Sequence, residues 1–223
     1  PNICTLFDVG STPSAGSAGS AEAAGGAHVD YLVMEYLEGE TLAARLERGA
    51  LPLADALKTA IEIASALDKA HRQGIVHRDL KPGNIMLVKS GGARSEATQA
   101  KLLDFGLAKI GPAGALSGVA PTGLLTSPRP AGQPLTAQGT ILGTFQYMAP
   151  EQIEGDEADA RTDIFAFGAV LSEMLTGRRA FAGKSQASLI GAILKEQPPP
   201  VSQITAVAPP ALDHVVGVCL AKD

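Results

Sequence analysis

Four polar side chains in the middle of the chain have the types and spacing that a chemical site needs. Asp79, Lys81 and Asn84 stand within one short polar loop, and Asp104 begins a second loop twenty residues after Asn84. A carboxylate can take a proton from a hydroxyl, and carboxylate and amide oxygens are the ligands that Mg²⁺ prefers. Residues of these types could supply one proton acceptor, one cation and two metal-binding oxygens.

The motifs around these residues follow one another in a defined order. His77-Arg78-Asp79-Leu80-Lys81-Pro82-Gly83-Asn84 comes first, Asp104-Phe105-Gly106 second and Ala149-Pro150-Glu151 third. Each motif alone is weak, but together and in this order they resemble the protein-kinase signature set, and most closely that of bacterial Hanks-type Ser/Thr kinases. The resemblance implies ATP-dependent transfer of the γ-phosphoryl group to Ser or Thr hydroxyls of protein substrates.

The resemblance implies a catalytic role for each residue of the two loops. Asp79 would accept the hydroxyl proton, and Lys81 would contact the γ-phosphate of ATP. Asn84 and Asp104 would bind Mg²⁺, with Mn²⁺ as the alternative. The hydroxyl of Thr144 would bridge Asp79 and Lys81, a contact typical of Ser/Thr-specific members.

The strand before the first loop resembles the hinge on which protein kinases bind adenine. Met34 would stand at the gatekeeper position, the backbone of Glu35 and Leu37 would pair with the base, and Met86 would lie under it. An ordinary edge strand and a plain core methionine would produce the same sequence pattern.

The resemblance also implies structural roles. The Asp163 carboxylate would accept backbone N–H bonds from His77 and Arg78, and Leu6, His77 and Phe105 would belong to an internal hydrophobic stack. Glu151 would pair with an arginine that this sequence does not contain. The structural set is His77, Phe105, Gly106, Glu151 and Asp163.

Arg78 carries a regulatory implication, because an arginine before the base pairs with a phosphorylated residue of the activation segment in this family. Thr136 or Thr140 is the expected phosphosite, and Thr126 and Ser127 are weaker candidates. A partner kinase for autophosphorylation is expected with it. Unmodified, solvated loop threonines are the plain alternative.

Hydrophobic periodicity and turn residues predict an α+β, mostly helical fold. The resemblance implies a protein-kinase-like fold, in which a mostly helical C-lobe follows the last strands and hinge of an N-lobe. We expect an N-lobe remnant at 1–34 with a flexible insertion at 11–27, a hinge at 35–40, and a C-lobe at 41–223 with an activation segment at 104–151. The expected strands are 2–10, 28–34, 75–76, 85–88 and 101–103, and the expected helices are 40–47, 54–72, 163–176, 185–195 and 211–221. On the helix at 54–72, one apolar stripe is predicted, formed by Leu57, Ile61, Ala64, Leu67 and His71.

Composition excludes several other classes of protein. Charged residues make up 18% of the 223 residues and the net charge is −5, without the basic cluster that nucleic-acid binding needs. Two cysteines at opposite ends predict reduced thiols and a cytoplasmic location. No apolar run is long enough for a membrane span, so any anchor would lie outside this sequence.

Both ends of the sequence predict a piece of a longer domain. The chain starts with Pro1, no glycine-rich phosphate loop or ATP-positioning strand lysine is found, and the chain stops at Asp223. We therefore expect these residues alone to be inactive. The rival hypotheses are a pseudokinase or interaction module, a small-molecule phosphotransferase, and a scaffold that uses Pro198–Pro200.

Overall fold

The computed structural model describes residues 1–13, 28–89, 98–105 and 145–222. The expected α+β class is confirmed. Gly106, Thr136, Thr140 and Thr144 lie outside the described residues, as does most of the predicted insertion. The strands are β1 (Leu6–Pro13), β2 (His28–Met34), β3 (Gly39–Thr41), β4 (Ile85–Lys89) and β5 (Thr98–Leu102). The helices are α1 (Leu42–Leu46), α2 (Leu53–His71), the 3₁₀ turn η1 (Pro82–Asn84), α4 (Pro150–Glu154), α5 (Ala160–Thr176), α6 (Gln186–Lys195), α7 (Val201–Ile204) and α8 (Pro210–Cys219).

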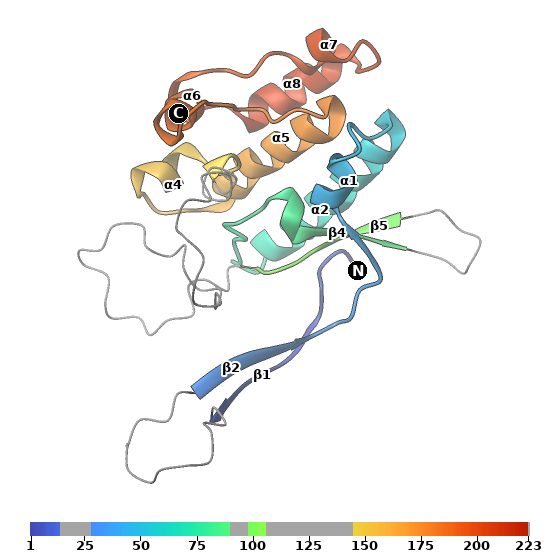
Figure 1. Ribbon diagram of the computed structural model, residues 1–223, viewed down its shortest axis with the longest axis vertical. Helices are drawn as coiled ribbons and strands as arrows, with labels where there is room; N and C mark the ends of the chain where they lie inside the picture. The colour runs from blue at the N-terminus through green and yellow to red at the C-terminus, as the bar shows by residue number, and fades with distance from the viewer. Residues whose placement is uncertain (14–27, 90–97, 106–144, 223) are drawn as a thin grey trace.

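β1 and β2 form an antiparallel hairpin that projects from the helical body (Figure 1). Leu6 pairs with Met34 and Pro13 with His28, with an irregularity between Leu6 and Asp8. The first strand therefore runs from Leu6 to Pro13. The expected strand at 2–10 was misplaced, and the insertion predicted from residue 11 starts too early. The reason is that pairing with β2 keeps Ser11, Thr12 and Pro13 extended even though their composition favours a loop.

A second sheet has the order β3-β4-β5, with antiparallel pairing throughout. The chain start adds to its edge, because Ile3 bridges Leu102 in parallel. The helix expected from Glu40 is wrong at its start, since Gly39–Thr41 pairs with β4. The Thr41 hydroxyl accepts a hydrogen bond from the Ala44 N–H at 3.2 Å, so the helix begins only after this N-cap.

The core lies where α2 packs against both β5 and α5 (Figure 1). The apolar stripe expected on α2 was offset, because Ile61 is 66% exposed and Ala64 is exposed as well. Small residues instead form much of the buried face, and they let the helix approach its neighbours closely. The buried residues of α2 are Ala56, Thr59, Ala60, Ile63, Ala66, Leu67 and Ala70.

Local signals set one boundary each of α5 and α6, whereas α8 ends at Cys219, before the expected residue 221. Gly177 takes φ = 66° and closes α5, and the Ser185 side chain caps α6. The short helices α4 and α7 were not predicted, and Ile75–Val76 is not a strand. Within the part of the chain that the structure describes, no helix combines the length and apolarity of a membrane span.

Candidate active site

The loop between α2 and β4 gathers three of the predicted site residues around one carboxylate oxygen. Lys81 Nζ lies 2.6 Å from Asp79 Oδ2, and Asn84 Nδ2 donates to the same oxygen at 2.9 Å. Asn84 Nδ2 also contacts the Asp79 carbonyl oxygen at 2.9 Å. The cationic donor and the amide donor both use Oδ2, and among the described residues no donor contacts Oδ1. The Asp79 side chain is half exposed, so its carboxylate can accept a hydrogen bond from a further donor.

The shape of this loop follows from its apolar and cyclic residues. Leu80 is 2% exposed and Pro82 is buried, so both anchor the loop in the core. Pro82 opens η1, where its fixed φ favours a helical start, and the Asn84 N–H donates to the Lys81 carbonyl at 2.9 Å. The turn therefore directs Asn84 back toward Asp79.

Asp163, in the first turn of α5, holds the start of the loop from below. Its side chain is fully buried. Oδ1 accepts the Arg78 N–H at 2.8 Å, and Oδ2 accepts the His77 N–H at 2.8 Å. These are the two bonds that the family resemblance implied. His71 Nε2 also lies 2.7 Å from Oδ2. Sequence reasoning missed this last contact, because it assigned His71 to an apolar stripe.

The His77 ring connects the loop at 77–84 to the segment before Asp104. Its Nε2 donates to the Leu103 carbonyl at 2.9 Å, and its Nδ1 accepts the Asp79 N–H at 3.4 Å. The ring packs against Phe105 with a centroid distance of 4.7 Å. Burial lowers the pKa of the His77 imidazole, against the opposing charge of Asp163. A neutral ring with the proton on Nε2 satisfies both contacts. Leu6, expected in the same stack, is 45% exposed on β1.

Asp104 and Asn84, the two predicted cation ligands, come from adjoining segments. The Leu103 N–H donates to the Asn84 carbonyl at 2.9 Å, which ties the two segments together. Asp104 takes φ = 52°, a left-handed conformation that aspartate tolerates better than most residues. Its side chain is exposed, and no donor among the described residues contacts it or Asn84 Oδ1. These oxygens fit a hard divalent cation that keeps water or phosphate oxygens as its other ligands. Within the described ranges there is no cluster of three His, Cys, Asp or Glu side chains.

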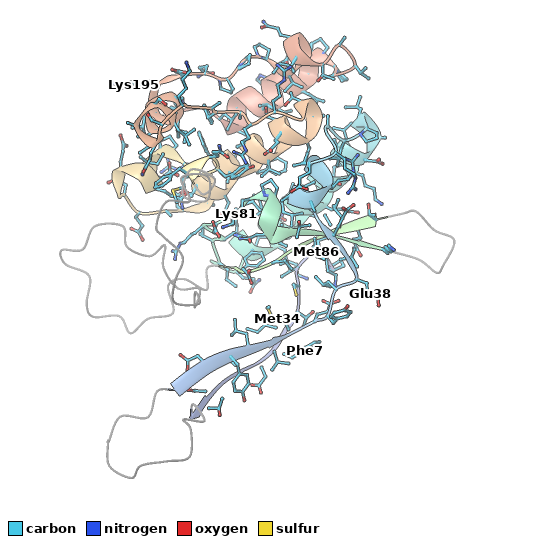
Figure 2. The ribbon with its side chains drawn as sticks, in the orientation of Figure 1. Phe7, Met34, Glu38, Lys81, Met86 and Lys195 are labelled. Carbon is cyan, nitrogen blue, oxygen red and sulfur yellow. The ribbon has the colours of Figure 1, made fainter. Side chains whose placement is uncertain are left out.

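The candidate adenine residues lie where the hairpin joins the body. Figure 2 shows Met34 at the base of the hairpin and Met86 on the facing edge of the body. Met34 is 43% exposed, and Met86 pairs with Thr41 in the β3–β4 ladder. The Glu35 N–H already donates to the Thr5 carbonyl at 2.9 Å. The Glu35 carbonyl accepts the Cys4 thiol at 3.8 Å and keeps a second lone pair, so this oxygen and the Leu37 backbone are the predicted hinge groups that can still hydrogen-bond a ligand.

The Glu35 side chain has a separate, structural task. Its carboxylate forms an ion pair with Lys101 at 2.5 Å, which lowers the pKa of the Glu35 carboxyl. The contact joins the connector after β2 to β5, and so helps to place the hairpin relative to the body.

Residues 145–154, which end in α4, form hydrogen bonds to α5 and to the loop at 77–84. The Glu151 carboxylate accepts the Thr162 hydroxyl at 2.6 Å, and it forms no ion pair with any described residue. The Tyr147 hydroxyl donates to Glu173 at 2.5 Å, and burial raises the pKa of the Glu173 carboxyl. Gln152 Nε2 donates to the Arg78 carbonyl at 2.8 Å. No sequence signal points to this contact, because its partners are 74 residues apart.

Comparisons with known proteins identify the family of the chain. The protein kinase domain model matches residues 1–223. The chain is 36% identical to the serine/threonine-protein kinase Pkn1 of Myxococcus xanthus, over 99% of this chain and 27% of that protein. It is 34% identical to the serine/threonine-protein kinase PknA of Mycobacterium tuberculosis, over 100% of this chain and 43% of that protein. With PknA of Corynebacterium glutamicum it shares 36% identity, over 86% of this chain and 35% of that protein. The chain thus spans less than half the length of these curated relatives.

Proposed function

The chain belongs to the protein kinase family, and on that premise we propose that it carries the catalytic residues of an ATP-dependent protein Ser/Thr kinase. The observation that carries the proposal is the convergence of Lys81 Nζ and Asn84 Nδ2 on one oxygen of Asp79, at 2.6 and 2.9 Å. This arrangement leaves the second oxygen of Asp79 for the hydroxyl of a substrate.

The proposed reaction assigns one step to each of these groups. The Ser or Thr oxygen attacks the γ-phosphorus, its proton passes to Asp79 Oδ1, and the bond between the γ-phosphorus and the β–γ bridging oxygen breaks to release ADP. Lys81 Nζ offsets charge on the transferring phosphoryl group. The carboxylate of Asp79 orients the hydroxyl through a hydrogen bond, and its contact with Lys81 fixes the position of Oδ2.

Asn84 Oδ1 and the Asp104 carboxylate would hold the divalent cation that accompanies ATP, Mg²⁺ or alternatively Mn²⁺. The cation would neutralise phosphate charge. For adenine, the proposal assigns the Glu35 carbonyl and the Leu37 backbone as hydrogen-bonding groups, with Met34 and Met86 as apolar contacts. The exposed Asp104 and the half-buried Met86 support these assignments.

The proposal includes the division of the chain and its regulation. Residues 1–34 would belong to the N-lobe, 35–40 to the hinge and 41–223 to the C-lobe. Arg78 would pair with a phosphate on Thr136 or Thr140, and another copy of the kinase is the proposed source of that phosphate. Arg78 Nε is buried and has no hydrogen-bond partner among the described residues, which supports an incoming acceptor.

The test is a phosphorylation assay on the full-length gene product, with peptides that carry a single Ser, Thr or Tyr. Asp79→Asn removes the base and keeps the shape, and we expect kcat to fall by about 10² to 10⁴-fold with the KM for ATP within a factor of about three. Asp68→Asn is the matched control, because Asp68 is exposed on α2 and, among the residues that the structure describes, its side chain pairs with Arg72 alone.

Three outcomes would contradict the proposal. One is a wild-type protein that transfers no phosphate to any peptide in the presence of Mg²⁺ or Mn²⁺, as a pseudokinase would behave. Another is transfer to small-molecule alcohols in place of peptides. The third is an Asp79→Asn variant as active as Asp68→Asn.

A further inference from the structure

The backbone of Arg78 is held in a conformation that few residues adopt. Its φ is +66°, in the left-handed region that is costly for a side chain with a Cβ. Arg78 stands immediately before Asp79, so its conformation sets the direction in which the base leaves the buried loop. Such a conformation persists only where neighbouring groups hold both ends of the residue.

Two side chains hold Arg78, one at each end. Asp163 Oδ1 accepts its N–H at 2.8 Å, and Gln152 Nε2 donates to its carbonyl oxygen at 2.8 Å. Asp163 comes from α5, and Gln152 comes from α4, which Figure 1 shows at the N-terminal end of α5. The left-handed residue is therefore clamped from two different helices.

The second half of the Gln152 side chain is used as well. Its Oε1 accepts the Ala149 N–H at 3.1 Å, and Ala149 is fully buried. The carboxamide thus accepts from Ala149, the N-cap residue of α4, and donates to the residue that precedes Asp79. Glutamine supplies both the donor and the acceptor from one planar amide.

We propose that Gln152 is a positioning residue for phosphoryl transfer, which couples the start of α4 to the left-handed peptide that aims Asp79. The inference rests on the proposed kinase function. Any displacement of Ala149 moves the amide that Gln152 presents to Arg78, so the end of the predicted activation segment and the base are joined by one side chain. ATP-binding groups take no part in this contact, so Gln152 acts on the rate of transfer and not on nucleotide affinity.

The test compares variants in the full-length gene product. Gln152→Glu keeps the shape and the acceptor, but places a carboxylate oxygen against the Arg78 carbonyl. Gln152→Met keeps the length and loses both hydrogen bonds. Gln186→Glu is the matched control, because it makes the same chemical change at an exposed position in the first turn of α6.

We expect Gln152→Glu to lower kcat for a Ser or Thr peptide by about tenfold or more, the factor that the loss of a buried hydrogen bond produces when it is felt in the transition state. Gln152→Met should lower kcat less than Gln152→Glu, and the KM for ATP should stay within about twofold in both variants. Hydrogen exchange should rise in peptides that contain residues 76–84, while peptides from α6 and α8 keep their wild-type exchange.

The inference is overturned if Gln152→Glu keeps kcat within twofold of Gln186→Glu. It is also overturned if exchange rises throughout α5, α6 and α8, because Gln152 would then serve only the stability of the domain. A wild-type protein without kinase activity would contradict the proposed function instead. In that case, hydrogen exchange of residues 76–84 in the Gln152 variants, compared with wild type, still tests whether Gln152 holds the peptide at Arg78.

Discussion

The substitution Asp163→Asn removes one negative charge and replaces one carboxylate oxygen by an NH₂ group, beside the backbone of the loop at 77–84. The side chain is fully buried and its two oxygens accept three donors, His71 Nε2 and the N–H groups of His77 and Arg78. Whichever way the asparagine amide turns, its NH₂ group faces at least one of these donors. One buried donor is then left without an acceptor.

The magnitude follows from counting these contacts. An unsatisfied buried donor costs about 1–3 kcal/mol. Each contact that remains changes from a charged to a neutral acceptor and loses about 1 kcal/mol, since charged hydrogen bonds contribute about 1.5–3 kcal/mol and neutral ones about 0.5–1.5 kcal/mol. The expected loss in the free energy of unfolding is therefore about 3–5 kcal/mol, the range seen when one partner of a buried charged contact is removed.

The assay is hydrogen exchange of α5 peptides in increasing urea, which reports the unfolding of this region within the full-length protein. His71→Gln is the graded control, because glutamine keeps a donor toward Asp163 and leaves both backbone bonds in place. It should lose less than about 1.5 kcal/mol. A loss below about 1 kcal/mol for Asp163→Asn would refute the reasoning. It would mean that the two N–H groups find other acceptors when the carboxylate is gone.

Two further predictions follow from the buried positions. The free energy of unfolding should fall as the pH drops below 6.5, the ordinary pKa of histidine, because burial lowers the pKa of His77 and the unfolded chain binds the extra proton. His77 should contribute at most about 1.4 kcal/mol per pH unit to the slope of the unfolding free energy against pH, and His77→Phe should reduce that slope. If the unfolding free energy from urea titrations changes with pH in the same way in this variant, the lowered pKa of His77 is contradicted. Gly168→Ala should cost about 1–3 kcal/mol in urea unfolding, because its new Cβ would lie 2.6 Å from the Cys219 Cβ. Gly191→Ala in α6, where a Cβ meets nothing within 4 Å, should stabilise instead, and equal effects of the two would contradict this packing.

The features that short sequence segments encode were predictable. The order of the three motifs identified the family, which the comparisons confirm, and the fold class followed with it. Gly177 and Ser185 bounded helices correctly because a left-handed cap and a side-chain cap depend on a few neighbouring residues. The strand at 28–34 was placed to the residue.

The features that depend on distant partners were not predictable. The buried face of α2 was misjudged because Ile61 looks like a core residue, while the approach of α5 and the sheet selects a face lined largely with alanine. Glu40 reads as helical, but its backbone pairs with Leu87, more than forty residues away. The same limit hid Gln152, whose two hydrogen bonds reach Ala149 and Arg78 through a glutamine that any surface helix could carry. Hydrophobic periodicity carries no information about which elements meet.

The contacts around Asp79, the proposed base, fall into two groups that involve different atoms. Asp163, Gln152 and the Leu103 carbonyl act on the backbone or the buried ring of residues 77 and 78, and none of them contacts the Asp79 carboxylate. Lys81 and Asn84 contact that carboxylate, but only at Oδ2. The residues before the proposed base are therefore held in place while Oδ1 of Asp79 keeps both of its lone pairs for a substrate hydroxyl. The hydrogen bonds to the N–H and the carbonyl of Arg78 offset the cost of about 1–2 kcal/mol that its left-handed conformation carries.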